Sequence, residues 1–164
     1  MSSGPGDASR AASADAPDTP ALRMTVDELN DFLREAFNGD RPYHVESLDR
    51  DHARLVIPAD QLLLRPGGTV SGPTLMMLAD AAAYAAILAH IGPVALAVTS
   101  TFTISFLRKP QPVGIVADAE ILKLGRKLAV VEVRMRSEGS PALVAQATAT
   151  YAIPSSDWDH GAGS

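Results

Sequence analysis

The chain has 164 residues, of which 46% are hydrophobic and 20% are charged. This composition supplies the core of one folded domain and excludes both a disordered chain and a multidomain assembly. The net charge of −5 has the wrong sign for a protein that tracks nucleic-acid phosphates or an anionic membrane surface. The sequence contains no cysteine and four scattered histidines, so we expect no disulfide, no metal site, no cofactor and a cytoplasmic location.

The two ends of the chain differ in composition from its centre. Residues 1–24 are rich in Ser, Ala, Gly, Pro and Asp and lack the apolar run of a secretory signal. We expect them to form a disordered tail, and we expect the polar, Gly-rich residues 154–164 to form a flexible one. A single domain over residues 25–153 remains.

The domain is predicted to open with an amphipathic helix. Thr25 and Glu28 have the spacing of a capping box, and apolar residues recur at helical intervals until Asn38 and Gly39 stop the pattern. Short strand-like runs at 43–48 and 53–57 then predict a hairpin, which a loop over residues 58–70 follows.

The second predicted helix is apolar on nearly every side. Ser71, Gly72 and Pro73 are typical of a helix start, and Gly92 and Pro93 mark its end. The apolar run of residues 75–91 is shorter than the roughly 20 residues that span a bilayer, so it indicates a buried helix of a soluble domain. His90, near its end, is predicted to serve as a cap or a surface residue.

Four further runs, at 95–107, 113–122, 128–136 and 142–153, alternate apolar and polar residues with the period of a strand. Each has one apolar face; in the first run this alternation puts Thr99 on the polar face with Thr101 and Thr103. The short turns between the runs predict an antiparallel meander.

These elements predict an α+β fold in which a curved antiparallel sheet of about five to six strands wraps a long central helix, with an additional N-terminal helix. This is the hotdog arrangement. A sheet does not easily cover such a helix on every side, and its edge strands need partners, so we expect a homodimer or a dimer of dimers.

Asp80 is anomalous in this pattern. A carboxylate within an apolar helix costs several kcal/mol unless it is paired or lies beside water. It is therefore either a functional group or a structural aspartate bonded to a loop backbone.

The same segment resembles a known family. Residues 67–73, Gly-Gly-Thr-Val-Ser-Gly-Pro, followed by 74–80, Thr-Leu-Met-Met-Leu-Ala-Asp, are similar to the signature of hotdog acyl-CoA thioesterases of the phenylacetate-pathway (PaaI) and 4-hydroxybenzoyl-CoA type. The resemblance continues through residues 99–107 and the pair Gly125-Arg126, and it covers roughly residues 43–153. Ser71 stands where the family has His, and Pro73 stands at its second Gly.

The resemblance implies the catalytic residues. Asp80 would activate water or attack the thioester carbonyl directly. The backbone N–H of Gly72 would polarise the carbonyl, helped by the helix dipole. Thr99 would be a supporting hydroxyl or an ordinary strand threonine. Gly72 and Asp80 are eight residues apart on one helix, a rise of about 12 Å, so we expect one of the two groups to come from a second subunit.

Further residues are expected to bind substrate. Ser71 and Pro73 lie in the signature, and Tyr84 lies one turn beyond Asp80, where it would line an acyl pocket. The basic residues that could hold coenzyme A phosphates are Arg65, Arg108, Lys109, Lys123, Arg126 and Lys127, although such residues are usually solvated surface charges.

The function expected from the sequence is hydrolysis of a small acyl-CoA or aryl-CoA thioester at a dimer-interface site, without nucleic-acid or membrane partners. One alternative is a hotdog protein that binds acyl-CoA without turnover. Another is a hotdog enoyl-CoA hydratase or dehydratase, but Ser71 replaces the histidine that such an enzyme would normally need.

Overall fold

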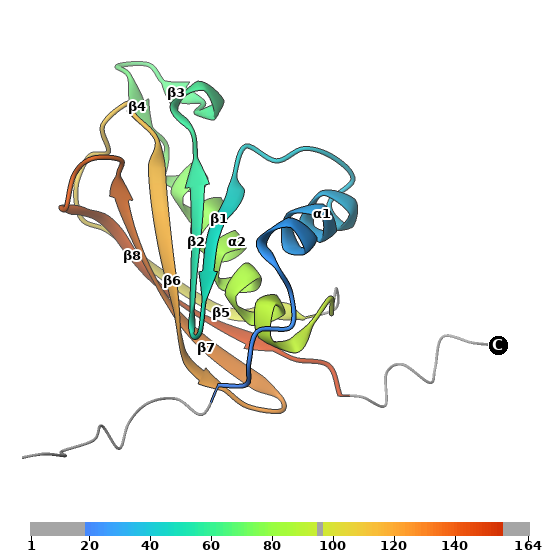
Figure 1. Cartoon of the computed structure of the whole chain (residues 1–164). Helices are drawn as coiled ribbons and strands as arrows, with labels where there is room; N and C mark the ends of the chain where they lie inside the picture. Colours follow the sequence, from blue (N-terminus) through green and yellow to red (C-terminus); the bar gives the residue numbers. More distant parts are fainter. Residues whose placement is uncertain (1–18, 95–96, 156–164) are drawn as a thin grey trace, which may run out of the picture.

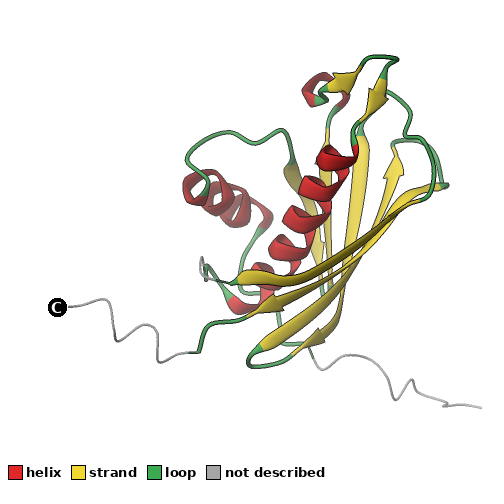
Figure 2. Cartoon of the chain, turned by 180° about the vertical axis from the view of Figure 1, so that it is seen from behind, coloured by secondary structure: helices red, strands yellow, loops and turns green. Residues whose placement is uncertain are grey.

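A computed structural model describes residues 19–94 and 97–155. It shows a six-stranded sheet curved around one long helix, with a second helix beside it (Figure 1). Seen from behind, the long helix lies along the concave face of the sheet (Figure 2). The predicted α+β hotdog fold is confirmed.

Every neighbouring pair of strands in the large sheet is antiparallel, and the order is β1-β2-β6-β7-β8-β5. A separate small hairpin and a 3-10 turn occupy the loop between β2 and the long helix. The strands and the turn are β1 His44–Asp49, β2 His52–Ile57, η1 Ala59–Gln61, β3 Leu64–Arg65, β4 Thr69–Val70, β5 Val98–Phe106, β6 Ile115–Leu124, β7 Leu128–Ser137 and β8 Leu143–Ala152.

The predicted meander is wrong for its first strand. β5 pairs with β8 at the edge of the sheet, whereas β6 lies between β2 and β7. The connection over residues 107–114 carries Pro110 and Pro112, which donate no backbone hydrogen bond and do not favour a tight hairpin. Residues 95–96, which the sequence assigns to this strand, lie outside the described residues.

The long helix α2, Gly72–Ile91, begins and ends as predicted. The Ser71 hydroxyl accepts a hydrogen bond from the N–H of Thr74, and the N–H of Gly92 closes the last turn on the carbonyl of Leu88. Most of α2 from Leu75 to His90 is buried against the sheet. Its length and composition would suit a membrane span, yet 67% of its most apolar window is buried inside the fold.

Alanine dominates the contact between helix and sheet. The fully buried alanines on the inner face of the sheet are Ala53, Ala117, Ala119, Ala129, Ala145, Ala147 and Ala149. Small side chains on both surfaces let the helix backbone approach the strands closely, so the sheet can wrap it without leaving voids. The position of each residue on α2 is therefore closely defined, including the one carboxylate that the helix carries.

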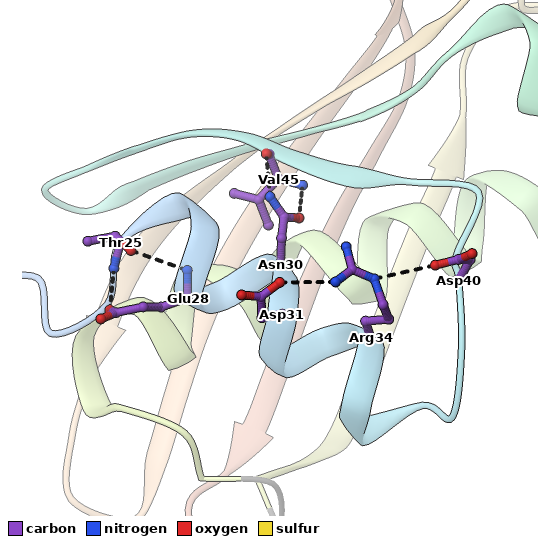
Figure 3. A network of polar contacts seen from close by, with 7 residues as sticks. All are labelled: Thr25, Glu28, Asn30, Asp31, Arg34, Asp40 and Val45. Atoms are coloured by element: carbon purple, nitrogen blue, oxygen red, sulfur yellow. Dashed lines mark hydrogen bonds and ion pairs between the residues drawn. The ribbon is translucent and has the colours of Figure 1, made fainter.

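The N-terminal helix α1, Val26–Ala36, has the capping box expected of Thr25 and Glu28. It is fastened to the edge strand β1 by Asn30, whose amide donates to the carbonyl of Val45 at 3.0 Å and accepts from its N–H at 2.8 Å (Figure 3). Arg34 pairs with Asp31 and Asp40. These bonds fix the segment that connects α1 to β1.

The expectation of a disordered tail over residues 1–24 is wrong for residues 19–24. Thr19 is buried, and its carbonyl accepts a hydrogen bond from the Arg50 guanidinium at 2.9 Å. The N–H of Arg23 donates to the carbonyl of Ala89 at 2.7 Å. These contacts with the fold outweigh the polar composition of the segment. Residues 1–18 and 156–164 lie outside the described residues.

The prediction for His90 is also wrong, because its side chain is 1% exposed. Its Nε2 accepts a hydrogen bond from the N–H of Asp51 at 3.4 Å, which leaves Nδ1 to donate to the carbonyl of Ala86 at 2.8 Å. The imidazole thus joins the end of α2 to the turn between β1 and β2. Both ring nitrogens are satisfied within the core.

Candidate active site

Asp80 lies on α2 with its side chain half-buried and directed at the β5–β8 edge of the sheet. The hydroxyl of Thr99 donates to its Oδ1 at 2.8 Å, and the phenol of Tyr151 donates to the same oxygen at 2.6 Å. Two donated hydrogen bonds offset the cost of placing a carboxylate in an apolar helix. The anomaly in the sequence is thus resolved by strand side chains and not by a loop backbone.

The register of the sheet brings the two hydroxyls together. Thr99 and Tyr151 are directly opposite one another on β5 and β8, so their side chains leave the same face. A bulge between Thr99 and Thr101 adds Ser100 to β5, and the Ser100 hydroxyl donates to the carbonyl of Thr150. This extra residue turns Thr99 toward the helix, whereas strict alternation would have left it on the outer face with Thr101.

A cavity of about 560 Å³ opens at this carboxylate. Aromatic rings from four parts of the chain form much of its wall: Phe37 follows α1, Tyr43 precedes β1, and Tyr84 and Tyr151 come from α2 and β8. Tyr84 stacks on Tyr151 with ring centroids 6.0 Å apart, and Phe37 meets Tyr84 edge-on at 6.1 Å. The remaining lining residues are Ala36, Arg41, Met77, Asp80, Ala81, Ala97, Val98 and Thr99.

All three tyrosines of the chain line this cavity, and each has a raised pKa. Burial is the main cause at Tyr43 and Tyr84. At Tyr151, burial and the hydrogen bond to Asp80 together raise the pKa far above its usual value. The Tyr151 phenol therefore keeps its proton at neutral pH and can donate it.

The site residues expected from the sequence do not all meet at this cavity. Asp80, Thr99 and Tyr84 line it, whereas Ser71, Gly72 and Pro73 lie at the start of α2. Ser71 caps that end, and Pro73 lines a neighbouring cavity of about 520 Å³. The helix separates Gly72 from Asp80 within one chain by a rise of about 12 Å, as the sequence predicts.

The basic residues expected to bind substrate lie elsewhere. Arg65 is exposed on β3, and Arg126 is exposed in the turn between β6 and β7. Arg108 and Lys109 are exposed after β5, where the Arg108 guanidinium donates to the carbonyl of Leu143 at 3.1 Å. Lys123 and Lys127 are likewise exposed near the β6–β7 turn.

The cation at the cavity is Arg41, which the sequence pattern does not single out. Its guanidinium donates to the carbonyl of Phe37 at 2.9 Å and lies 4.6 Å from the centroid of that ring. Tyr151 was also missed, because its place in the alternation of β8 is that of an ordinary core residue. Within residues 19–94 and 97–155, no three His, Asp or Glu side chains form a group that could hold a metal ion.

The fold and the site together define the class of this protein. It is a hotdog domain with one carboxylate in the wall of an aromatic cavity. A family model described as the thioesterase superfamily matches residues 67–143. A candidate thioesterase from a Silicibacter species is 39% identical, with 85% of this chain and 98% of that one covered and a TM-score of 0.78. The chain belongs to the thioesterase superfamily, which confirms the expected enzyme class, a thioester hydrolase.

Two further structures extend the comparison. A mutant of the phenylacetic acid degradation protein PaaI from Thermus thermophilus is 30% identical, covering 68% of this chain and 93% of that one, with a TM-score of 0.58. Thioesterase superfamily member 2 of zebra fish, at 20% identity, covers 80% of this chain and 99% of its own with a TM-score of 0.69, and it shows the fold alone. Curated protein sequences give no match.

Proposed function

We propose that this protein hydrolyses the thioester of a small acyl-CoA or aryl-CoA at a site formed between two subunits. The observation that carries the proposal is the Asp80 carboxylate, which lies at the wall of an aromatic cavity with two hydroxyls donating to one of its oxygens. A cavity of about 560 Å³ lies within the range that holds small molecules. Its apolar lining fits an acyl group better than a charged one.

In the hydrolytic step, the Asp80 carboxylate takes a proton from water as the water oxygen bonds to the thioester carbonyl carbon. The tetrahedral intermediate then collapses, the carbon–sulfur bond breaks, and the proton passes to sulfur. The products are a free carboxylic acid and the thiol of coenzyme A. In the alternative route, the carboxylate itself attacks, thiolate leaves, and water hydrolyses the resulting anhydride.

The exposed edge of the sheet supports the proposal that a second subunit binds there. β5 is an edge strand, and the apolar residues Val98 and Phe106 on it are 56% and 52% exposed. Met76 and Met77 on the adjoining helix are 42% and 36% exposed. Pairing of β5 with β5 of a second copy would continue the sheet and cover these side chains. We place the homodimer interface here; a further pairing of dimers stays a prediction.

The second subunit supplies the carbonyl polariser in this proposal. The first N–H groups of a helix have no partner within it, and the Ser71 side chain caps Thr74, not Gly72. The Gly72 N–H at the positive end of α2 can therefore donate to a developing oxyanion. Ser71 and Pro73 flank this donor and would contact substrate.

A cytoplasmic location stays a prediction.

The test is thiol release from a panel of short, branched and aromatic acyl-CoA esters, measured for the wild type and for Asp80→Asn. Asparagine keeps an oxygen to accept from Thr99 and Tyr151, so the fold is retained while the reacting charge is lost. We expect kcat/KM to fall about 100-fold or more. Near wild-type turnover by the variant would make Asp80 structural. Saturable binding of the esters without thiol release would favour the non-catalytic binding protein.

A further inference from the structure

Tyr151 is the buried polar group that the proposed mechanism leaves without a role. It lies on β8, its side chain is 2% exposed in the folded chain, and its phenol makes the shortest hydrogen bond to Asp80. An apolar residue would fill this place in the alternation of β8 equally well. What distinguishes the phenol from an apolar residue is its hydrogen bond to the carboxylate.

Both donors to Asp80 converge on one oxygen. Thr99 and Tyr151 donate to Oδ1 at 2.8 and 2.6 Å, and the phenol oxygen also lies 3.0 Å from the backbone carbonyl of Asp80. The phenol has one proton, and the shorter, charge-assisted bond to the carboxylate takes it. No bond from a described residue to Oδ2 accompanies these two.

The phenol itself is held rigidly. Its ring stacks on Tyr84 at 6.0 Å, and its strand is paired on both sides, with β7 and with β5. Thr99, by contrast, comes from the edge strand beside a bulge. A rigid donor on an inner strand defines the orientation of a carboxylate better than a hydroxyl at an open edge does.

We propose that Tyr151 is a positioning residue: together with Thr99 it holds Oδ1 of Asp80, so that Oδ2 is the oxygen that acts on water or on the thioester carbonyl. This inference rests on the proposed hydrolysis. It adds the assignment of the reactive oxygen and a role for a residue outside the signature segment. The raised pKa of the Tyr151 phenol supports it, because the phenol then keeps its proton at neutral pH.

Three tyrosines and one arginine face Asp80. They are the Tyr151 phenol from β8, Tyr84 on the same helix, Tyr43 before β1, and Arg41 in the segment after α1. Hydrogen bonds donated to a carboxylate favour its charged form. Removing the Tyr151 donor should therefore move the acidic limb of the pH–rate profile, whereas removing a cavity hydroxyl that does not donate to Asp80 should not.

The experiment compares the wild type with Tyr151→Phe, Thr99→Val and the double variant, and uses Tyr43→Phe as the matched loss of one cavity hydroxyl. Phenylalanine keeps the stacked ring at position 151. We expect Tyr151→Phe to lower kcat about tenfold with KM within about twofold. We expect its acidic limb to move to higher pH. The double variant should lose more of the wild-type kcat than either single variant does.

The outcomes separate this inference from the proposed function. If Tyr151→Phe keeps the wild-type kcat and acidic limb while Asp80→Asn is inactive, hydrolysis stands and the positioning role is refuted. An equal shift of the limb in Tyr43→Phe would also refute it, as would a loss of kcat with an unmoved limb. If the wild type releases no thiol from any ester, the proposed function and the positioning role both fall.

Discussion

The proposal that each subunit supplies one catalytic group makes a quantitative prediction for mixed dimers. The rise of about 12 Å between Gly72 and Asp80 on α2 is too long for one carbonyl to reach both, since an oxyanion donor lies about 3 Å from the carbonyl oxygen. In the proposed dimer, each of the two sites would be built from Asp80 of one subunit and Gly72 of the other. Asp80→Asn and Gly72→Pro disable different halves of every site.

The backbone before Gly72 and the space around it are compatible with Gly72→Pro. The residue is the first of α2, where proline fits well, and Ser71 before it has the extended backbone (φ −73°, ψ 154°) that a following proline requires. A Cβ at this position would meet the Phe106 ring at 3.4 Å, an ordinary contact. Gly72→Ala makes the same contact and keeps the N–H, so it is the matched control and should stay active.

The assay measures thiol release after the two inactive variants exchange subunits. Random exchange makes about half of the dimers mixed, and each mixed dimer has one intact site and one site without either group. Activity should therefore recover to about a quarter of the wild-type value per subunit. Sedimentation must show that Gly72→Pro still dimerises, and differently tagged subunits must show exchange. No recovery after demonstrated exchange would refute the composite site and the mechanism built on it.

Two other predictions concern stability. Removing residues 1–24 should lower the free energy of unfolding by about 1–2 kcal/mol more than removing residues 1–18, because it breaks the backbone bonds of Thr19 and Arg23; equal denaturation midpoints would contradict this. The raised pKa values of the tyrosines predict a contribution to the free energy of unfolding that depends on pH. This contribution is complete below pH 10.0, the pKa of tyrosine in the unfolded chain, and is lost as the pH rises through the higher pKa values of the folded protein. Urea denaturation between about pH 8 and 12 should show this loss, and Tyr151→Phe should reduce it. Tyrosinate absorbance from the folded protein below pH 10.0 would refute the assignment.

The helices could be predicted because their signals are local. The capping box of Thr25 and Glu28 and the start of α2 at Ser71 need only residues within one turn. Asp80 could be singled out for a related reason: a carboxylate in an apolar helix is costly wherever the helix packs. The sequence therefore determined one half of the candidate site before the sheet was considered.

The other half depends on contacts between residues distant in the chain. Alternation counts residues along one strand, so it missed the added residue at Ser100 that turns Thr99 toward Asp80. It also classed Tyr151 with the core alanines, because the direction of a phenol is set by the partner strand and the helix it faces. The edge position of β5 was missed because pairing with β8 or with β6 satisfies the same pattern. Such choices depend on the free energy of the whole packed sheet and helix, which cannot be read from the sequence of any single segment.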